Sequence, residues 1–503
     1  MNSVSQGNRI EPLIPALAVP QTGNRGHSRH TIGCLITLFL LSLPLVNPWV
    51  RGDGVGYYAY ARSVLIDHNL NFEKDWLTAN PSFSQGRLNA SGQLQTDQYS
   101  PTGHIKNHFS IGPSLLWSPF LIAAHGGVLV MDRVGAHIPA DGYSRPYRIA
   151  MAAGTAVYGF LGLLLAFDIA RDYVEERWAL LATLGIWLAS SLPVYMYFNP
   201  SWSHAHSAFA VALFLWYWNR TRNGRTFWQW LLLGLVAGLM MNVYYPNAIL
   251  LLVPALEAVV NYSRLTKIPE QGSMSTLDLL GRHVLFMVVA GLTLVPTFIT
   301  RRIIYGTTFE SGYPPMRTWF WTSPKLLQVL FSTDHGMLIW TPILIPAICG
   351  LFLFWRHDHL FGTGLLLSAL VFYFFIASYP DWDGISSFGN RFFVSMTSVF
   401  ILGLSATLEV SAGWSKKLGN SITAASCVVG LLVLWNFGLM FQWGSHMIPA
   451  RGPISFSEMA RNQFFVVPRQ FNGYLQAYLF KRRILMQQIE NRDLEQLERE
   501  ASP

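Results

Sequence analysis

Residues 31–60 read TIGCLITLFLLSLPLVNPWVRGDGVGYYAY, and the break in their composition sets the fold. The first part, Thr31 to Trp49, contains no charged residue and is long enough to cross a hydrocarbon core of about 30 Å as a helix. The second part, Arg51 to Tyr60, places Asp53 among three glycines and three tyrosines. A chain with this order leaves a membrane and presents an acidic side chain where it meets water.

The composition extends this pattern over the whole chain. Of its 503 residues, 51% are hydrophobic and only 12% are charged, whereas soluble proteins carry about 25% charged residues. The apolar residues fall in blocks of roughly 17–25, which is the length of a membrane-spanning helix. The net charge of +8 lies mainly in short loops between these blocks, where it indicates topology. We therefore predict an all-α, multi-pass integral membrane protein that does not bind nucleic acid.

The apolar blocks predict about eleven membrane-spanning helices. Their approximate ranges are 31–49, 149–169, 178–198, 204–218, 228–245, 247–261, 283–300, 337–355, 360–378, 391–410 and 420–441. Another apolar segment, 109–131, is interrupted by prolines and glycines, and we interpret it as an interfacial or re-entrant helix pair. The short loops 199–203, 246 and 379–390 then share one face and contain no Lys or Arg, while the basic loops share the other. The positive-inside rule places the basic loops in the cytoplasm.

This topology divides the chain into three segments. Residues 1–30 form a cytoplasmic tail, and 31–441 form the transmembrane domain, whose first external loop, 50–148, contains interfacial helices. Residues 442–503 form an external C-terminal segment, in which Tyr474 to Glu500 has the alternating charge of a surface helix.

Asp53 is the first candidate for chemistry. A carboxylate at this position could cap the helix that begins near Gly54. The alternative is a functional carboxylate, because the flanking glycines would let a bulky ligand approach the backbone. Tyr57 and Tyr58 offer stacking surface of the kind that sugars use.

The stretch GDGVGYYA (52–59), continued by SVLID (63–67), resembles the start of GT-C superfamily members. This superfamily includes the protein O-mannosyltransferases and the aminoarabinose transferases of lipid A. The segment from Arg148 to Trp178 is similar to their second span, and FGNR (388–391) resembles a motif of bacterial members. Where many members carry an Asp-Glu pair, this chain has Asp53-Gly54, so a second carboxylate is absent from that position.

The resemblance implies a GT-C-like bundle and a membrane glycosyltransferase. Such an enzyme moves a sugar from a polyprenyl-phosphate donor to a glycan, lipid or protein acceptor. Asp53 would be the general base that takes the proton of the acceptor hydroxyl, and the reaction would invert the anomeric centre. The implied location is a bacterial inner membrane, with the site facing the periplasm or exterior.

A phosphate leaving group requires cations or a metal. Arg391 begins a predicted span on the same face as Asp53, although snorkelling at the interface would explain it equally well. Arg301 and Arg302 lie at the outer end of another span, where basic residues are disfavoured. Lys106 precedes the segment at 109–131. We expect these four residues to contact the donor phosphate.

Sugar or acceptor contacts are expected from Tyr57 and Tyr58, from His204, and from Asp381, Trp382 and Asp383 in the loop before Arg391. A turn around Trp382 explains the acidic pair as well as binding does. His204 and His206 point about 200° apart on a helix, which is poor geometry for a shared metal. We therefore commit to no metal and no cofactor, although a divalent ion remains compatible with the loop. The three cysteines lie far apart in apolar blocks and indicate neither a disulfide nor a zinc site.

Two other functions remain open. A transporter or flippase of lipid-linked saccharides would use the same kind of bundle, but the predicted spans contain almost no ionisable residue near their midpoints. An oligosaccharide polymerase or ligase would share the external site and differ in its acceptor.

Overall fold

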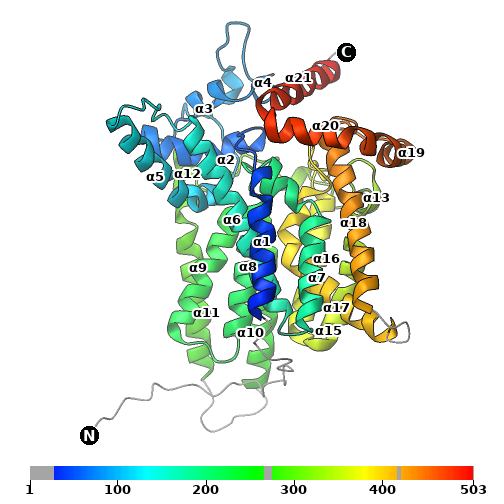
Figure 1. Cartoon of the computed structure of the whole chain (residues 1–503). Helices are drawn as coiled ribbons and strands as arrows, with labels where there is room; N and C mark the ends of the chain where they lie inside the picture. The colour runs from blue at the N-terminus through cyan, green and yellow to red at the C-terminus, as the bar shows by residue number, and fades with distance from the viewer. Residues whose placement is uncertain (1–27, 266–274, 416–420, 502–503) are drawn as a thin grey trace.

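The computed structural model describes residues 28–265, 275–415 and 421–501. The predicted cytoplasmic tail at 1–30 lies almost entirely outside these residues. Helices dominate the described chain, whose only β-pairing is two isolated bridges in the first loop. Figure 1 shows an upright helix bundle with a layer of shorter helices across one end. We call this the layered end and the other the loop end. The predicted all-α architecture is confirmed.

The upright helices follow the predicted spans in order. They are α1 (Ser28–Ser42), α6 (Arg145–Ala170), α7 (Glu176–Leu188), α8 (His204–Thr221), α9 (Phe227–Val243), α10 (Leu252–Leu265), α11 (Thr276–Thr293), α15 (Leu344–His357), α16 (His359–Ser378), α17 (Thr397–Ser415) and α18 (Ser421–Gly444). Seven helices in the described residues are long and apolar enough to cross a membrane, and six of them fall in predicted spans. Because α1, α9 and α15 are shorter apolar helices and α7 has only 13 residues, the count of eleven crossings stays a prediction.

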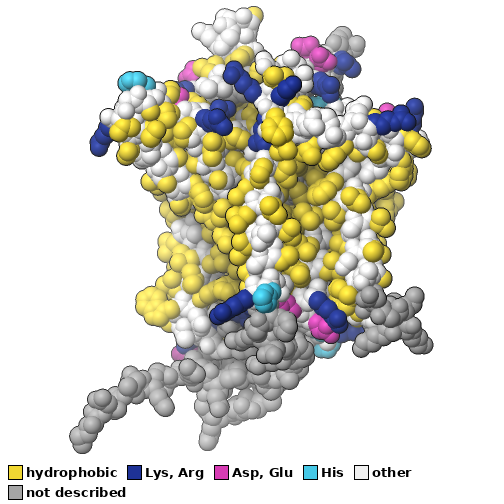
Figure 2. Space-filling view, viewed as in Figure 1, with side chains coloured by type: hydrophobic (Ala, Val, Ile, Leu, Met, Phe, Trp, Pro, Cys, Tyr) yellow, Lys and Arg dark blue, Asp and Glu magenta, His cyan; other side chains and the backbone are white. Residues whose placement is uncertain are grey.

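The surface of the bundle has the distribution expected of a membrane protein. Figure 2 shows hydrophobic side chains over the flank of the bundle and most charged side chains toward its two ends. Inside, small residues let helices approach closely: a Cβ added to Gly350 of α15 would lie 1.9 Å from the carbonyl oxygen of Gly403 in α17. Lipid tails are themselves apolar, so the hydrophobic effect does not drive helices together inside a membrane. Close backbone contact of this kind supplies van der Waals packing energy for helix association.

The layered end is built mainly from the first loop. It contains α2 (Asp53–Arg62), α3 (Glu73–Thr78), α4 (Pro81–Ser84) and α5 (Gly112–Arg133), joined by α12 (Val295–Tyr305) and α13 (Leu326–Phe331). The interfacial helices expected in the first loop are therefore present.

Helix α5 corrects one expectation. Residues 109–131 do not form a helix pair, because Gly112–Arg133 is one continuous helix. Pro113 lies in its first turn, where the missing N–H is not needed, and Pro119 is accommodated within the helix. By length and composition α5 is also a candidate span, yet Figure 1 draws it beside α2 in the layered end.

The C-terminal segment returns to the same end. It forms α19 (Phe456–Arg461), the single π-helical turn η9 (Asn462–Val466), α20 (Val467–Phe480) and α21 (Arg482–Ala501). Figure 1 shows α20 and α21 above the bundle, close to α4. The predicted surface helix at 474–500 corresponds to two helices, α20 and α21, which cover the layered end, and its external location stays a prediction. The first loop and the end of the chain lie together there.

Charged residues near the loop end are engaged in ion pairs. Arg225 donates to Glu257 at 2.7 Å, and Trp218 donates to the same carboxylate at 2.6 Å. Arg222 pairs with Asp358, which caps α16 by accepting from the amide of Phe361. These buried charges hold helices together, and each one has its partner.

Candidate active site

The turn before α2 fixes the position of Asp53. Gly52 has φ of +53°, a backbone region that disfavours side chains, and it allows Asp53 to become the first residue of α2. The indole of Trp202 donates to the carbonyl of Arg51 at 3.0 Å and anchors the turn. The carboxylate therefore lies at a helix N-terminus, where negative charge is favoured.

The other two glycines have a different role from the one expected. A Cβ on Gly54 would lie 2.0 Å from the hydroxyl of Ser201, and one on Gly56 would lie 2.0 Å from the ring of Phe109. The space beside these glycines is filled by the protein itself. They allow α2 to pack closely against neighbouring loops, so the expectation that they admit a ligand is wrong.

Arg391 comes from a distant part of the chain and contacts Asp53. It begins η7 (Arg391–Met396), the short 3-10 helix that leads into α17, and its Nη1 lies 2.6 Å from Oδ2 of Asp53. Its guanidinium lies over the ring of Trp202, 4.4 Å from the centroid. The arginine side chain is 9% exposed and the aspartate 31% exposed. A buried cation thus holds a carboxylate that still reaches open space.

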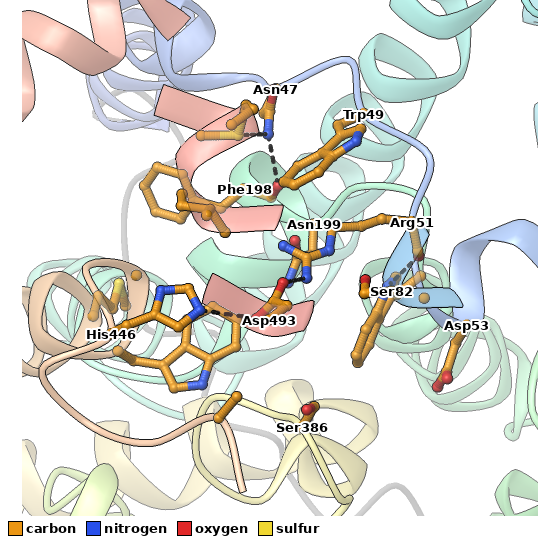
Figure 3. Close-up of a pocket in the computed structure, with 18 of the residues that line it drawn as sticks. Asn47, Trp49, Arg51, Asp53, Ser82, Phe198, Asn199, Ser386, His446 and Asp493 are labelled. Atoms are coloured by element: carbon orange, nitrogen blue, oxygen red, sulfur yellow. Dashed lines mark hydrogen bonds and ion pairs between the residues drawn. The ribbon is translucent and has the colours of Figure 1, made fainter. Parts of the chain in front are cut away.

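Asp53 and Arg391 line a cavity of about 500 Å³. Its polar end also contains Arg51, Arg87 and His108. The rest of its wall is mainly apolar and comes from the chain after η1 (Leu43–Leu45), the end of η4 (Val194–Phe198), the end of α18, and the C-terminal helices. It includes Trp49, Phe198, Phe437, Phe441, Phe471, Tyr474, Tyr478 and Ile489. Figure 3 shows Asp53 at one side of this cavity and Phe198 and Asn47 farther along it.

Basic side chains accompany Asp53 in the lining of the cavity, which also includes a second carboxylate, Asp493. Burial lowers the pKa of His108 to about 4, so this imidazole is neutral at pH 7. Burial also lowers the pKa of Arg87, and the nearby Asp53 acts in the opposite direction. Arg87 donates to the carbonyl of Phe83 and lies over its ring, 4.2 Å from the centroid. The site can hold an anion beside Asp53.

The C-terminal wall was not predicted as part of the site. Asp493 of α21 accepts from Nε2 of His446 at 2.8 Å and pairs with Arg51, two residues before Asp53. Figure 3 shows these three side chains converging from separate parts of the chain. Glu490, one turn earlier, accepts from the amide of Ser82 at 2.6 Å. The alternating charge of residues 474–500 indicates a surface helix, and nothing in the sequence marks Asp493 or His446 as part of a site.

Three predicted phosphate ligands lie away from the cavity. Arg301 is buried and donates to the carbonyls of Asn107, His108 and Phe109 at 2.7, 2.8 and 3.1 Å, so it pins the first loop. Arg302 is exposed and donates to the carbonyl of Gly306. Lys106 is exposed and donates to the carbonyl of Asp97 at 2.8 Å. Of the four candidate cations, only Arg391 lines the cavity.

The predicted sugar contacts are also outside the cavity lining. Tyr58 is buried and donates to the carbonyl of Gly142 at 2.7 Å, while Tyr57 packs on Phe109 with ring centroids 4.8 Å apart. His204 is buried at the start of α8, against Tyr195.

The loop at 381–383 is half-buried and forms a turn. The carboxylate of Asp383 accepts from the amide of Ile385 at 3.1 Å, and the carbonyl of Trp382 accepts from Asn390 at 2.8 Å. Asp381 lies beside Tyr379 and, after burial, is the largest cause of the raised pKa of that phenol. The turn at 381–383 therefore holds the side chain of Asn390, the residue that precedes Arg391. Within the described residues, no three His, Cys, Asp or Glu side chains gather as a metal site requires.

Of the comparisons with known proteins, the one with solved structures finds similar chains. No family model matches this chain, and no curated protein matches it. Among solved structures, the chain is similar to the crystal structure of ArnT from Cupriavidus metallidurans in the apo state. The match has a TM-score of 0.44 at 12% sequence identity and covers 83% of this chain and 71% of that one.

Proposed function

We propose that this protein is a membrane glycosyltransferase that moves a sugar from a polyprenyl-phosphate donor to an acceptor hydroxyl, with inversion and with Asp53 as general base. The observation that carries the proposal is the cavity. Its polar end holds an accessible carboxylate among arginines, and its remaining wall is mainly apolar. A lipid-linked sugar has the same division between an anionic, hydroxyl-rich head and a long apolar tail.

The pairing of Asp53 with Arg391 suits a general base. Arg391 occupies Oδ2 of the carboxylate at 2.6 Å, and Oδ1 has no hydrogen-bond partner within the described part of the chain. The guanidinium is itself held by Trp202. One oxygen is thus fixed and the other remains available to accept a proton, which is the arrangement that positions a base for catalysis.

The proposed step balances as a single displacement. The acceptor hydroxyl gives its proton to Asp53 while its oxygen bonds to the anomeric carbon. The bond from that carbon to the phosphate oxygen breaks, and polyprenyl phosphate leaves with the electron pair. Arg87 and Arg51 also line the cavity, and cationic donors there would stabilise the charge on the leaving phosphate.

The cell face is part of the proposal as well. The layered end carries Asp53 and Arg391, while the short loops with Arg171, Arg220 and Arg222 lie at the other end of the upright helices. The positive-inside rule then favours a cytoplasmic loop end and a site that opens to the periplasm or exterior. In a flippase, ionisable groups would be needed along a path through the bundle, and the pair Arg225–Glu257 is instead buried and satisfied.

Substitution of Asp53 by Asn tests the proposal. The amide cannot accept the proton, so transfer should fall by about 10²-fold or more. Membranes containing the protein would be incubated with a panel of isotope-labelled polyprenyl-phosphate hexoses and pentoses, and labelled glycoside would be measured.

The matched control is Asp97→Asn, because Asp97 is an exposed acid in the same loop. Its activity should equal that of the parent, and both variants should accumulate equally in membranes. Full transfer by the Asp53→Asn variant would reject Asp53 as the base. Movement of labelled lipid across vesicles that contain the parent protein, without any glycoside, would favour the flippase.

A further inference from the structure

The segment between α18 and α20 exposes an unusual number of large aromatic side chains. Phe464 and Phe465 in η9 are 65% and 62% exposed. Phe456 in α19 and Phe480 at the end of α20 are also exposed. Figure 1 shows α19 at the edge of the layered end, beside the upper part of α18. An apolar surface of this kind requires a partner.

The depth of η9 in the membrane follows from its attachment to α18. The side chain of Gln463 donates to the carbonyl of Trp435 at 2.9 Å and accepts from Gln442 at 2.8 Å. It lies against Gly438, where an added Cβ would be 2.1 Å from its amide nitrogen. Trp435 is nine residues before the end of the candidate span Ile422–Gly444. Gln442, the other partner of Gln463, is two residues before that end. At 1.5 Å per residue, the contacts that hold η9 therefore reach from about 3 Å to about 13 Å inside that end.

The exposed aromatics continue the lipid-facing side of α18. Leu431 and Leu434 of this helix are exposed, and Leu434 directly precedes Trp435. The ring of Phe464 lies 6.0 Å from that of Trp435. A side chain at this depth beside a membrane span meets acyl chains and not water.

The charge around η9 specifies the headgroups. Residues 456–484 contain five basic side chains and one acidic side chain. Arg461 and Arg469 flank η9 on either side, and both are exposed. A basic, aromatic-rich segment at an interface attracts anionic lipids.

We propose that η9 is a membrane wedge: Phe464 and Phe465 insert among the acyl chains of the leaflet at the layered end, and Arg461 and Arg469 bind the headgroups of anionic phospholipids. The wedge continues directly into α20, which carries Phe471 and Tyr474 of the cavity wall. Lipid contact would therefore position that wall. The proposal rests on the packing of η9 and does not depend on glycosyl transfer.

A fluorophore at residue 465 tests the insertion. The full chain would carry Ala in place of Cys34, Cys349 and Cys427, with Phe465→Cys as the labelled position. Gln488→Cys in α21 is the control, because Gln488 is exposed on a helix that lies on top of the bundle. In lipid nanodiscs, nitroxide-bearing acyl chains should quench the label at residue 465 at least about threefold more than the label at residue 488. Aqueous iodide should show the reverse order.

Contact of the label at residue 465 with water would mean that something other than lipid covers the aromatic surface. If iodide quenches both labels equally and lipid nitroxide quenches neither, the aromatic surface faces water and fits a protein partner, and the wedge is rejected.

Titration of the full chain with phosphatidylglycerol, followed by native mass spectrometry, tests the headgroup contact. The double variant Arg461→Gln/Arg469→Gln should weaken apparent binding by roughly fivefold for each arginine removed. The matched control Arg317→Gln/Arg499→Gln removes two exposed arginines from the same end and should leave binding unchanged. Equal binding by both double variants, or equal loss, would reject a specific role for Arg461 and Arg469.

Discussion

At the scale of single residues, the turn before α2 combines a conformational requirement with a chemical one. Gly52 supplies the positive φ, and Asp53 then begins a helix and faces Arg391. Gly54 supplies room for Ser201, whose hydroxyl accepts from the amide of Arg51 at 3.4 Å. A tightly packed turn therefore determines where the carboxylate lies, and packing next to it should affect activity.

Substitution of Gly54 by Ala tests this coupling. The new methyl group would overlap the side chain of Ser201, so we expect α2 to shift, thermal stability to fall and transfer activity to decrease about tenfold or more. Removal of the obstructing side chain in Gly54→Ala/Ser201→Gly should restore part of both properties, because the two residues are in direct contact. The melting temperature in detergent and the rate of transfer would be measured for the two single variants and the double variant. Strictly additive effects would show that the contact does not position Asp53.

At the scale of elements, α21 is attached to the site through polar contacts. Asp493 bridges His446 and Arg51, and Glu490 binds the start of α4. Burial disfavours the ionised form of Asp493, but the hydrogen bond from His446 and the charge of Arg51 outweigh it, so its pKa lies below the ordinary 3.8. An acid with a lowered pKa stabilises the folded arrangement above its ordinary pKa. The attachment should be complete at neutral pH and weaken only as the pH falls below about 4.

Substitution of Asp493 by Asn should loosen this attachment at neutral pH. The variant loses the ion pair with Arg51 and leaves that arginine without its partner, so amide hydrogen exchange in α21 and in residues 445–451 should accelerate at least about tenfold. Glu495→Gln is the control, since Glu495 pairs with the exposed Arg499 on the same helix. Hydrogen exchange with mass spectrometry would be recorded at pH 7. Unchanged protection in the Asp493→Asn variant would show that apolar packing alone holds α21.

The sequence predicted the elements better than it predicted their contacts. The lengths of the apolar blocks located the upright helices, and the composition of residues 51–60 made Asp53 a candidate. The FGNR segment identified Arg391, but the two residues are 338 positions apart and their pairing depends on the fold. Arg301 was misplaced because an arginine at a span end resembles a ligand, whereas carbonyls of the folded first loop surround it. Asp493 and His446 gave no local signal at all.

At the scale of the whole molecule, the side of the membrane that the site faces decides which substrates can reach it. The layered end contains the cavity, the first loop and the C-terminal helices, and the loop end contains the basic connections such as the one between α8 and α9. In the proposed function, a donor with a phosphate head and an apolar tail would reach Asp53 from the layered end, where the cavity lies. The proposed function therefore requires that this end face away from the cytoplasm.

Thiol labelling in a cysteine-free chain tests this orientation. Single cysteines would replace Gln93 in the first loop, Gln488 in α21 and Asn223 between α8 and α9, all of which are exposed. The first two lie at the layered end and should react with a membrane-impermeant maleimide on intact spheroplasts. Asn223→Cys lies among Arg220, Arg222 and Arg225 and should react only after permeabilisation, because short basic loops stay in the cytoplasm. Reaction of Asn223→Cys from outside, with protection of the other two, would place Asp53 in the cytoplasm and contradict an external glycosyltransferase.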